Sequence, residues 1–179
     1  MTKSDLRLKL KEARKNFSSA DRERADRRIF NLFFEKFICE QSYFIYNSFN
    51  FEADTKHIIS RLVFLGKQVL LPRVEGKNII PVPYSTTKIG AFGIEEPEGQ
   101  AYSGDIDVAV VPLLAVNSKG YRTGYGGGYY DRYLKNSSAY KVGLGYFFQI
   151  EEFENDDWDV KLDCLITETG IIYFDRDKK

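Results

Sequence analysis

The sequence predicts a three-layer α/β sandwich with a mostly parallel sheet, and three observations support this prediction. Segments with helical periodicity alternate with short apolar segments rich in β-branched and aromatic residues, the pattern of strands joined by crossover helices. One apolar segment, 107–111, is continuous and is stopped by Pro112, as expected for a strand buried on both faces. The chain has 179 residues, of which 43% are hydrophobic. This size suits one domain spanning residues 1–179.

The first half of the chain is predicted to contain three helices and three strands. Apolar residues over 3–15 share one helical face, and a second helix follows Ser18 or Ser19, with an apolar stripe from Ala25 to Phe37. The further predicted elements are a strand over 42–49, a loop over 50–53, a helix capped by Asp54 and reaching Leu65, and strands over 68–72 and 78–84. Two prolines limit the last strand to an edge of the sheet.

The second half of the chain is predicted to place a loop at the ligand-binding edge of the sheet. Residues 88–105 are polar and glycine-rich and predict a long loop before the buried strand at 107–111. After this strand come a glycine-rich loop, a helix over 129–135, a strand over 140–146, an acidic loop, and strands near 164–167 and 171–174. Ligands of such sheets bind beyond the carboxyl ends of the strands. The glycine-rich loop is expected there because it follows the buried strand.

The glycine-rich segment, 120–132, is the most informative part of the chain. Four glycines fall within 124–128, so consecutive backbone N–H groups can turn toward one anion. Arg122 and Arg132 add positive charge that suits phosphate oxygens, and the helix predicted to follow adds the positive end of its dipole. Asp131 supplies an oxygen ligand of the kind that a phosphate-bound Mg²⁺ accepts. The segment matches neither the P-loop nor the dinucleotide fingerprint, so we predict a polyphosphate site of a less common design.

Composition excludes several classes of function. Lys and Arg together number 26, as do Asp and Glu, so no global field attracts nucleic acid or an anionic membrane. The single histidine, His57, nearly excludes a zinc cluster and is expected on a helix surface. Cys39 and Cys164 are predicted to be buried thiols in a reducing compartment.

The chain also lacks the sequence signals of export. Residues 1–7 lack the apolar core of a signal peptide. No apolar run approaches the roughly 20 residues that cross a bilayer. We therefore expect a cytoplasmic protein with no membrane partner.

Three separated pieces of sequence together resemble the 5-formyltetrahydrofolate cyclo-ligase family, also called methenyltetrahydrofolate synthetase. They are Lys3-x-x-Leu6-Arg7, Glu52 just before Asp54-Thr55, and the segment from Arg122 to Asp131. The resemblance covers nearly the whole chain, and Gly-Gly-Gly-Tyr-Tyr-Asp-Arg is its most specific element. It also includes Leu71-Pro72-Arg73, Gly93-Ile94-Glu95-Glu96-Pro97, Asp107-Val108, Val111-Pro112 and Thr167-Glu168-x-Gly170.

The resemblance implies ATP-dependent closure of 5-formyltetrahydrofolate to 5,10-methenyltetrahydrofolate, with release of ADP and phosphate. ATP is then a co-substrate, Mg²⁺ its metal, and an iminium phosphate the intermediate. Such chemistry needs positioning and charge stabilisation and no nucleophilic side chain. The resemblance further implies a NagB/RpiA/CoA-transferase-like fold and a monomer whose partner is the small-molecule folate.

The resemblance also implies roles for individual residues. ATP binding falls to Lys3, Ser4, Asp5, Leu6, Arg7, Arg122, Gly124, Tyr125, Gly126, Gly127, Gly128, Tyr129 and Tyr130. Substrate binding falls to Asn47, Glu52, Tyr125, Gly127 and Tyr129, with Glu52 accepting hydrogen bonds from the pterin ring. Catalysis falls to Arg122 and Tyr130, and the metal falls to Asp131, with Asp163 as a second ligand. The candidates for stacking on the pterin are Phe49, Tyr84 and Phe92.

The sequence departs from the family pattern at a few positions, and two other functions stay open. Leu113, Asn117, Thr123 and Trp158 stand where the family often has glycine, aspartate, leucine and histidine, respectively. One alternative is a sugar-phosphate isomerase that needs no ATP and uses Glu52 or Glu96 as a general base. The other is an RNA-binding module, which the neutral charge opposes. The carboxylates of Glu95, Glu96 and Glu98 are expected to form a solvated loop.

Overall fold

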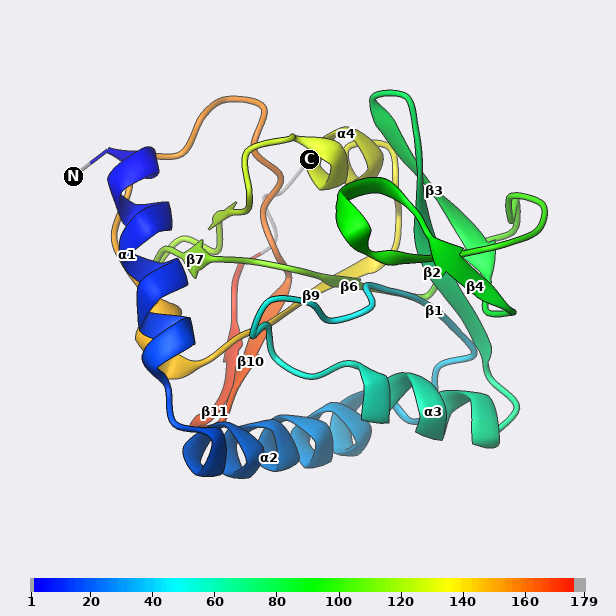
Figure 1. Cartoon of the computed structure of the whole chain (residues 1–179), viewed down its shortest axis with the longest axis horizontal. Coiled ribbons are helices and arrows are strands. Elements are labelled where there is room, and N and C mark those ends of the chain that lie inside the picture. Colours follow the sequence, from blue (N-terminus) through cyan, green and yellow to red (C-terminus); the bar gives the residue numbers. More distant parts are fainter. Residues whose placement is uncertain (1, 176–179) are drawn as a thin grey trace.

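The computed structural model describes residues 2–175 and has a seven-stranded sheet at its centre (Figure 1). In spatial order the strands are β11 (Gly170–Tyr173), β10 (Cys164–Thr167), β9 (Tyr140–Leu144), β6 (Val108–Val111), β1 (Ser42–Ile45), β2 (Gln68–Glu75) and β3 (Asn78–Pro83). The strands from β10 to β2 run parallel, and the two edge strands are antiparallel to their neighbours. The mostly parallel sheet is confirmed, as is the edge position of the proline-bearing strand β3.

Helices cover both faces of this sheet, which confirms the three layers. The helices α2 (Ser19–Phe37) and α3 (Lys56–Phe64) lie on one face, α4 (Tyr129–Leu134) lies on the other, and α1 (Lys3–Asn16) stands at one side (Figure 1). Side chains of β1 alternate accordingly: Tyr43 and Ile45 pack in the core under α2 and α3, and Phe44 packs in the core under α4. The sheet thus has a hydrophobic core on each face, because successive residues of a strand point to opposite faces and this strand is buried on both.

Polar side chains fix where the helices begin. The Ser18 hydroxyl accepts the N–H of Asp21 and caps α2, as predicted. Thr2 and Asp5 form a reciprocal capping box at α1. The helix α3 begins at Lys56 with Thr55 in the capping position, and the Asp54 carboxylate accepts the N–H groups of the first two helical residues. His57 is exposed on this helix, as expected.

Several predicted boundaries are wrong, and hydrogen bonding explains them. The segment 88–105 is not one long loop, because it contains β5 (Glu95–Pro97), which pairs with β4 (Thr87–Ile89), and the short helix η1 (Ala91–Gly93). The strand β2 continues past Pro72 because its antiparallel pairing with β3 reaches Glu75. Both β1 and β9 end earlier than predicted, at Ile45 and Leu144. A further hairpin of β7 (Ala115–Val116) and β8 (Arg122–Thr123) precedes the glycine-rich loop.

The two cysteines differ in environment. Cys164 is buried in the core under α2, as predicted, and this burial raises the pKa of its thiol to about 12. Cys39 is exposed, so the prediction that it is buried was wrong. It lies just past the end of α2, where the apolar stripe of the helix has stopped.

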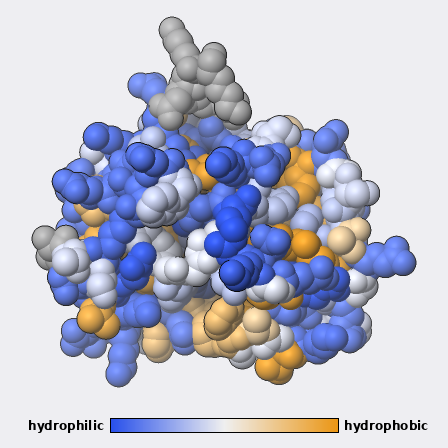
Figure 2. Space-filling view, turned by 90° about the horizontal axis from the view of Figure 1, so that it is seen from above, coloured by the Kyte–Doolittle hydropathy of each residue, from blue (hydrophilic) through white to orange (hydrophobic). Residues whose placement is uncertain are grey.

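The outer surface agrees with the balanced composition. Seen from the side of α4, the molecule is covered mostly by hydrophilic residues, with smaller apolar patches between them (Figure 2). Within residues 2–175, no helix combines the length and the apolar character needed to span a bilayer.

Candidate functional site

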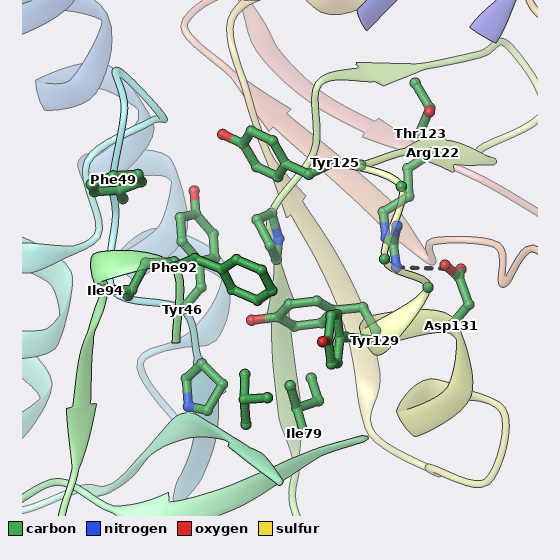
Figure 3. A pocket seen from close by; sticks show the side chains of 18 of the residues that line it. Tyr46, Phe49, Ile79, Phe92, Ile94, Arg122, Thr123, Tyr125, Tyr129 and Asp131 are labelled. Atoms are coloured by element: carbon green, nitrogen blue, oxygen red, sulfur yellow. Dashed lines mark hydrogen bonds and ion pairs between the residues drawn. The ribbon is translucent and has the colours of Figure 1, made fainter. Parts of the chain in front are cut away.

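A pocket opens where the order of the sheet reverses. From β1 the chain continues to β2 on one side, whereas β6, the neighbour of β1 on the other side, leads on to β9. Such a reversal leaves a crevice beyond the carboxyl ends of the two strands. A cavity of about 660 Å³ lies there, lined by Tyr46 and Asn47 directly after β1 and by Pro112 directly after β6 (Figure 3). The cavity thus lies at the edge of the sheet where we predict a ligand site.

The glycine-rich loop forms one wall of the cavity. Gly126 and Gly128 have positive φ values of 101° and 65°, which glycine adopts without steric cost. A Cβ atom on Gly127 would lie 2.7 Å from the ring of Tyr129. The backbone from Gly124 to Tyr130 therefore lines the cavity in a conformation that side chains on these glycines would disturb.

Arg122 and Thr123 place buried hydrogen-bond donors at this wall. Arg122 is 4% exposed, and its Nη2 lies 3.3 Å from the Oδ1 of Asp131 (Figure 3). Among residues 2–175, the Nε of Arg122 and the hydroxyl of Thr123 are buried without a partner. A buried donor without an acceptor costs free energy, so an anionic ligand at this wall would relieve the cost.

Asp131 itself is partly engaged by the protein. Its Oδ1 accepts a hydrogen bond from the Arg122 guanidinium and another from the N–H of Val160 at 3.2 Å. The residue lines the cavity beside the glycine loop, so it could offer a carboxylate oxygen to a metal ion there.

Asp163, the second predicted metal ligand, lies elsewhere. Its carboxylate accepts the N–H of Lys141 at 2.7 Å, at the amino end of β9 and β10, and it does not line the cavity. The structure therefore does not bring Asp163 to Asp131. Within residues 2–175, no three His, Cys, Asp or Glu side chains gather as a preformed metal site.

Two of the five predicted residues at the start of α1 line the cavity. Arg7 donates from Nε to the carbonyl of Gly124 at 2.8 Å, and the Lys3 ammonium lies 2.6 Å from Asp156 and 2.8 Å from Asp159. Ser4 and Asp5 are exposed on the outer side of the helix and Leu6 is buried in the core. The alternation follows from the helical period, which sends positions 3 and 7 to one side.

Arg132 holds the glycine loop against the turn between β2 and β3. Its guanidinium donates to the carbonyl of Lys77 in the β2–β3 turn and to the carbonyl of Gly127. The residue is absent from the lining of the cavity. The positive charge expected to face a phosphate therefore anchors the loop instead.

The opposite wall contains Glu52 on the loop after β1. Its Oε1 accepts the Tyr125 hydroxyl at 3.0 Å and its Oε2 accepts the N–H of Phe49 at 2.9 Å. Burial raises the pKa of the Glu52 carboxyl, although these hydrogen bonds and the nearby Arg14 charge oppose the shift. Asn47 donates to Glu95 at 3.3 Å and also lines the cavity. The structure thus brings Asn47, Glu52 and Tyr125 together.

Aromatic side chains line the same wall. Phe49 and Phe92 border the cavity and Tyr84 does not, so two of the three stacking candidates are present (Figure 3). Tyr130, in the first turn of α4 after the glycine loop, is partly buried, and its ring centre lies 5.8 Å from the Arg122 guanidinium. Burial raises the pKa of the Tyr130 hydroxyl well above its ordinary value. This phenol therefore stays protonated and can act only as a neutral donor or acceptor.

Glu96 corrects the expectation of a solvated acidic loop. It is 8% exposed, accepts the N–H of Val74 at 3.2 Å, and lines the cavity. Glu95 on the same strand is exposed, as expected. Strand alternation in β5 turns one carboxylate outward and the next inward.

Sequence reasoning missed Arg14. It is 1% exposed, and its Nη2 donates to the Tyr125 hydroxyl at 2.6 Å. A signal was available, because Arg14 follows Leu6 and Leu10 at the four-residue spacing that marks the buried face of α1. Asp156 was also missed as a cavity residue.

The positions that depart from the family pattern have local explanations. Leu113 is buried, and its carbonyl accepts Gln149 at 3.2 Å. The side-chain oxygen of Asn117 accepts the N–H groups of Lys119 and Tyr121, which closes the β7–β8 turn. Trp158 lines the cavity although it is 69% exposed.

Comparison with known proteins agrees with this geometry. The model of the 5-formyltetrahydrofolate cyclo-ligase family matches residues 1–168. A 5-formyltetrahydrofolate cyclo-ligase of Haemophilus influenzae is 30% identical over 92% of this chain and 97% of the relative. One of Mycoplasma genitalium is 45% identical over 75 residues, which span 41% of this chain and about half, 46%, of that relative.

Solved structures are similar over the full length of the chain. The 5,10-methenyltetrahydrofolate synthetase of Aquifex aeolicus matches with a TM-score of 0.88 and 33% identity, over 100% of this chain and 96% of that one. The Mycoplasma pneumoniae synthetase matches with a TM-score of 0.77 and 26% identity, over 94% and 99% respectively.

Proposed function

The chain belongs to the 5-formyltetrahydrofolate cyclo-ligase family, and from this premise we propose that it converts 5-formyltetrahydrofolate to 5,10-methenyltetrahydrofolate at the expense of ATP. One arrangement carries the assignment to this cavity: Arg122, the glycine loop and the half-buried Glu52 all line it, and the Nε of Arg122 is buried without a partner among residues 2–175. A cationic wall opposite an anionic wall suits a substrate pair in which a polyphosphate meets a heterocycle rich in N–H donors.

The reaction divides into two displacements in this proposal. The formyl oxygen attacks the γ-phosphorus of ATP, and the bond to ADP breaks. The N10 nitrogen then attacks the activated formyl carbon and loses its proton, and the bond from carbon to the phosphorylated oxygen breaks to release phosphate. Every oxygen lost by the folate leaves on phosphate, so no water and no nucleophilic side chain is needed.

Groups of the glycine-loop wall would stabilise the negative charge that develops on the phosphoryl oxygens. Arg122 would donate from Nε and Nη to these oxygens, and the backbone N–H groups of 124–128 would cradle the triphosphate. Tyr130, protonated at all physiological pH values, would donate to the formyl or bridging oxygen. Arg7 would add charge after exchanging the Gly124 carbonyl for a phosphate oxygen.

A Mg²⁺ ion fits one position in this arrangement. Asp131 lines the cavity beside the loop, and Mg²⁺ commonly binds one or two carboxylates together with substrate phosphates and water. When bound, the ion would neutralise charge on the phosphate oxygens. Asp163, engaged with Lys141 at the other end of β9, is left out of the proposal.

The opposite wall would hold the pterin ring. Glu52 would accept its amino and ring N–H donors, Asn47 would contribute an amide, and Phe49 or Phe92 would stack on its face. This wall therefore sets the position of the formyl group relative to the γ-phosphate.

The oligomeric state and the cellular location of the protein are also part of the proposal. We infer a monomer that acts in the cytoplasm on a small-molecule folate, as the family resemblance implies. Light scattering of the purified protein across a range of concentrations would reveal a dimer if one forms.

The reaction is tested by following the absorbance of methenyltetrahydrofolate with purified protein, 5-formyltetrahydrofolate, Mg²⁺ and ATP. Product that forms only with ATP, together with one ADP per product, is the expected result. The same rate without ATP, or no product from folded protein that binds ATP, would overturn the proposal.

A further inference from the structure

Arg14 is a buried cation for which the proposed reaction has no direct use. It lies in the last turn of α1, is 1% exposed, and does not line the cavity. Its Nη1 reaches the carbonyl of Leu113 at a long 3.4 Å, and its Nε is buried without a partner among residues 2–175. A buried guanidinium so incompletely hydrogen-bonded is destabilising in itself, so a fold that keeps it needs a reason outside packing.

The strongest contact of Arg14 leads into the cavity. Its Nη2 donates to the Tyr125 hydroxyl at 2.6 Å, and that hydroxyl donates onward to Oε1 of Glu52 at 3.0 Å. Its guanidinium carbon also lies 5.8 Å from the centre of the Tyr125 ring. The three side chains come from α1, the glycine loop and the loop after β1, and they form one directional chain of hydrogen bonds with Tyr125 at its middle. Figure 3 labels Tyr125 among the side chains that line the cavity.

We propose that Arg14 is a positioning residue for folate binding, which acts through the Tyr125 hydroxyl to hold the Glu52 carboxylate ionised and aimed into the cavity. The inference rests on the proposed function, because it gives Glu52 its role toward the pterin. It adds a residue outside the cavity to the machinery, and it links the phosphate-side loop to the folate-side carboxylate.

The charges around Glu52 support this role. The titratable groups that face it are Tyr125 from the glycine loop, Tyr130 from α4, Tyr46 from the end of β1, and Arg14 from α1. Arg14 is the one cation among these groups. Tyr146 is also near, but its hydroxyl contacts the backbone carbonyl of Glu52 and not the carboxylate. Burial and the charge of Glu52 raise the pKa of Tyr125 to about 12, so this phenol stays protonated and the hydrogen-bond chain keeps one direction.

Removal of Arg14 has two expected consequences. Glu52 loses a positive charge that lowers its pKa, so its pKa rises further above the ordinary value. Tyr125 loses the donor that fixes its hydroxyl, so both the carboxylate and the glycine loop lose a restraint. Folate affinity should fall at neutral pH, and the loss should grow as the pH is lowered.

The test measures KM for 5-formyltetrahydrofolate and for ATP between pH 5.5 and 8.5 in wild type, Arg14→Gln and Arg14→Lys. We expect Arg14→Gln to raise the folate KM about tenfold at pH 7 and to move the acid limb of the profile upward by ~0.5 to 1 pH unit. Arg14→Lys should restore much of the profile because it keeps the charge. Arg27→Gln, an arginine that is exposed on α2, is the matched control and should change nothing.

A second variant series separates positioning from packing. In a Glu52→Gln background, Arg14→Gln should raise the folate KM by less than about twofold, because the group on which Arg14 acts is gone. Tyr125→Phe, which cuts the chain without touching the core, should move the acid limb in the same direction as Arg14→Gln. Equal effects of Arg14→Gln in both backgrounds, or an acid limb that superimposes on wild type, would overturn the proposal.

A direct titration keeps this test independent of the reaction. Carbon NMR of carboxyl-labelled glutamate reports the pKa of Glu52 in the free protein, with Glu52→Gln to assign the signal. A pKa that is higher in Tyr125→Phe and Arg14→Gln than in wild type supports the coupling even if no ATP-dependent product forms. An unchanged pKa in both variants refutes it, whatever the activity.

Discussion

The two walls of the cavity differ in the charge that they leave unsatisfied. At the glycine-loop wall, Arg122 retains a buried donor without an acceptor within the described part of the chain. At the opposite wall, Glu52 and Glu96 are carboxylates that form no ion pair within residues 2–175 and accept only backbone or phenolic hydrogens. The first wall thus holds a hydrogen-bond donor without an acceptor, although Asp131 also lies there, and the second holds carboxylates without a cation among residues 2–175. The two walls therefore differ in the groups that a bound ligand would have to supply, as the proposed pair of a polyphosphate and a pterin would do.

The largest effect on activity is expected when the charge of Arg122, at the glycine-loop wall, is removed. Arg122→Gln removes the charge that, in the proposed reaction, faces the transferring phosphoryl group, and it leaves Asp131 without this ion pair. We expect kcat to fall about 10²- to 10³-fold, as for other preorganised transition-state donors. Initial rates at saturating ATP and folate measure it, with Arg27→Gln as the surface control. A rate within threefold of wild type would exclude Arg122 from catalysis.

Neutralising the other wall should affect the other substrate. Glu52→Gln keeps the shape of the side chain but presents an amide to the pterin donors, so we expect the folate KM to rise by ~30- to 100-fold. The KM for ATP should change by less than about twofold. Steady-state kinetics with each substrate varied in turn checks both values. A selective rise in the ATP KM would mean that the two walls have been assigned the wrong way round.

The same variant should be more stable than wild type at neutral pH. Burial raises the pKa of Glu52 in the folded state above its value in the unfolded chain. The ionised carboxylate therefore lowers the free energy of unfolding above the raised pKa. This penalty fades as the pH falls through the raised pKa and is absent below the unfolded value. Urea unfolding at pH 7.5 and pH 4 should show a gain for Glu52→Gln that is larger at pH 7.5. A gain that is larger at pH 4 would contradict the sign of the shift.

The sequence predicts one wall better than the other, for a physical reason. The glycine loop is recognisable because four glycines fall within 124–128, and the positive φ values of Gly126 and Gly128 are local properties of the chain. Likewise, the prolines of β3 mark an edge strand because they lack a donor wherever they stand. The sandwich could thus be predicted from local signals and hydrophobic periodicity.

The opposite wall is assembled by tertiary structure and was predicted less well. Glu96 is turned inward by the pairing of β4 with β5, which the polar composition of 88–105 conceals. Arg14 is buried because Tyr125 and Leu113 meet it from distant parts of the chain. Asp163 fails as a predicted ligand because strand β10 begins at the end of the sheet away from the cavity. Burial of a charged residue depends on such neighbours, and a single sequence does not display them.

Two glycines with similar backbone angles can test whether the conformation of the glycine loop matters for ATP binding. Gly128 and Gly66 have nearly the same φ, 65° and 70°, but Gly66 lies outside the cavity with open space around its missing Cβ. Alanine at either position should lower the free energy of unfolding by ~1 kcal/mol. Only Gly128→Ala should raise the KM for ATP, by about fivefold, because its Cβ would displace Arg132 from the loop that it anchors. Urea unfolding and ATP kinetics of both variants separate backbone strain from loss of the site.

The smallest expected effect concerns Lys3, a lysine that lines the cavity from α1. Lys3 is held by Asp156 and Asp159, so a phosphate must compete with two carboxylates for its ammonium group. Asp156→Asn removes one competitor and should lower the KM for ATP by about twofold, the scale of a partly exposed ion pair. The gain should shrink in 0.5 M salt. Glu151→Gln is a matched control, since it frees Lys9 of the same helix from the same acidic loop outside the cavity. An equal gain in both variants would mean that the acidic loop repels ATP through its overall charge, and that Lys3 has no special role.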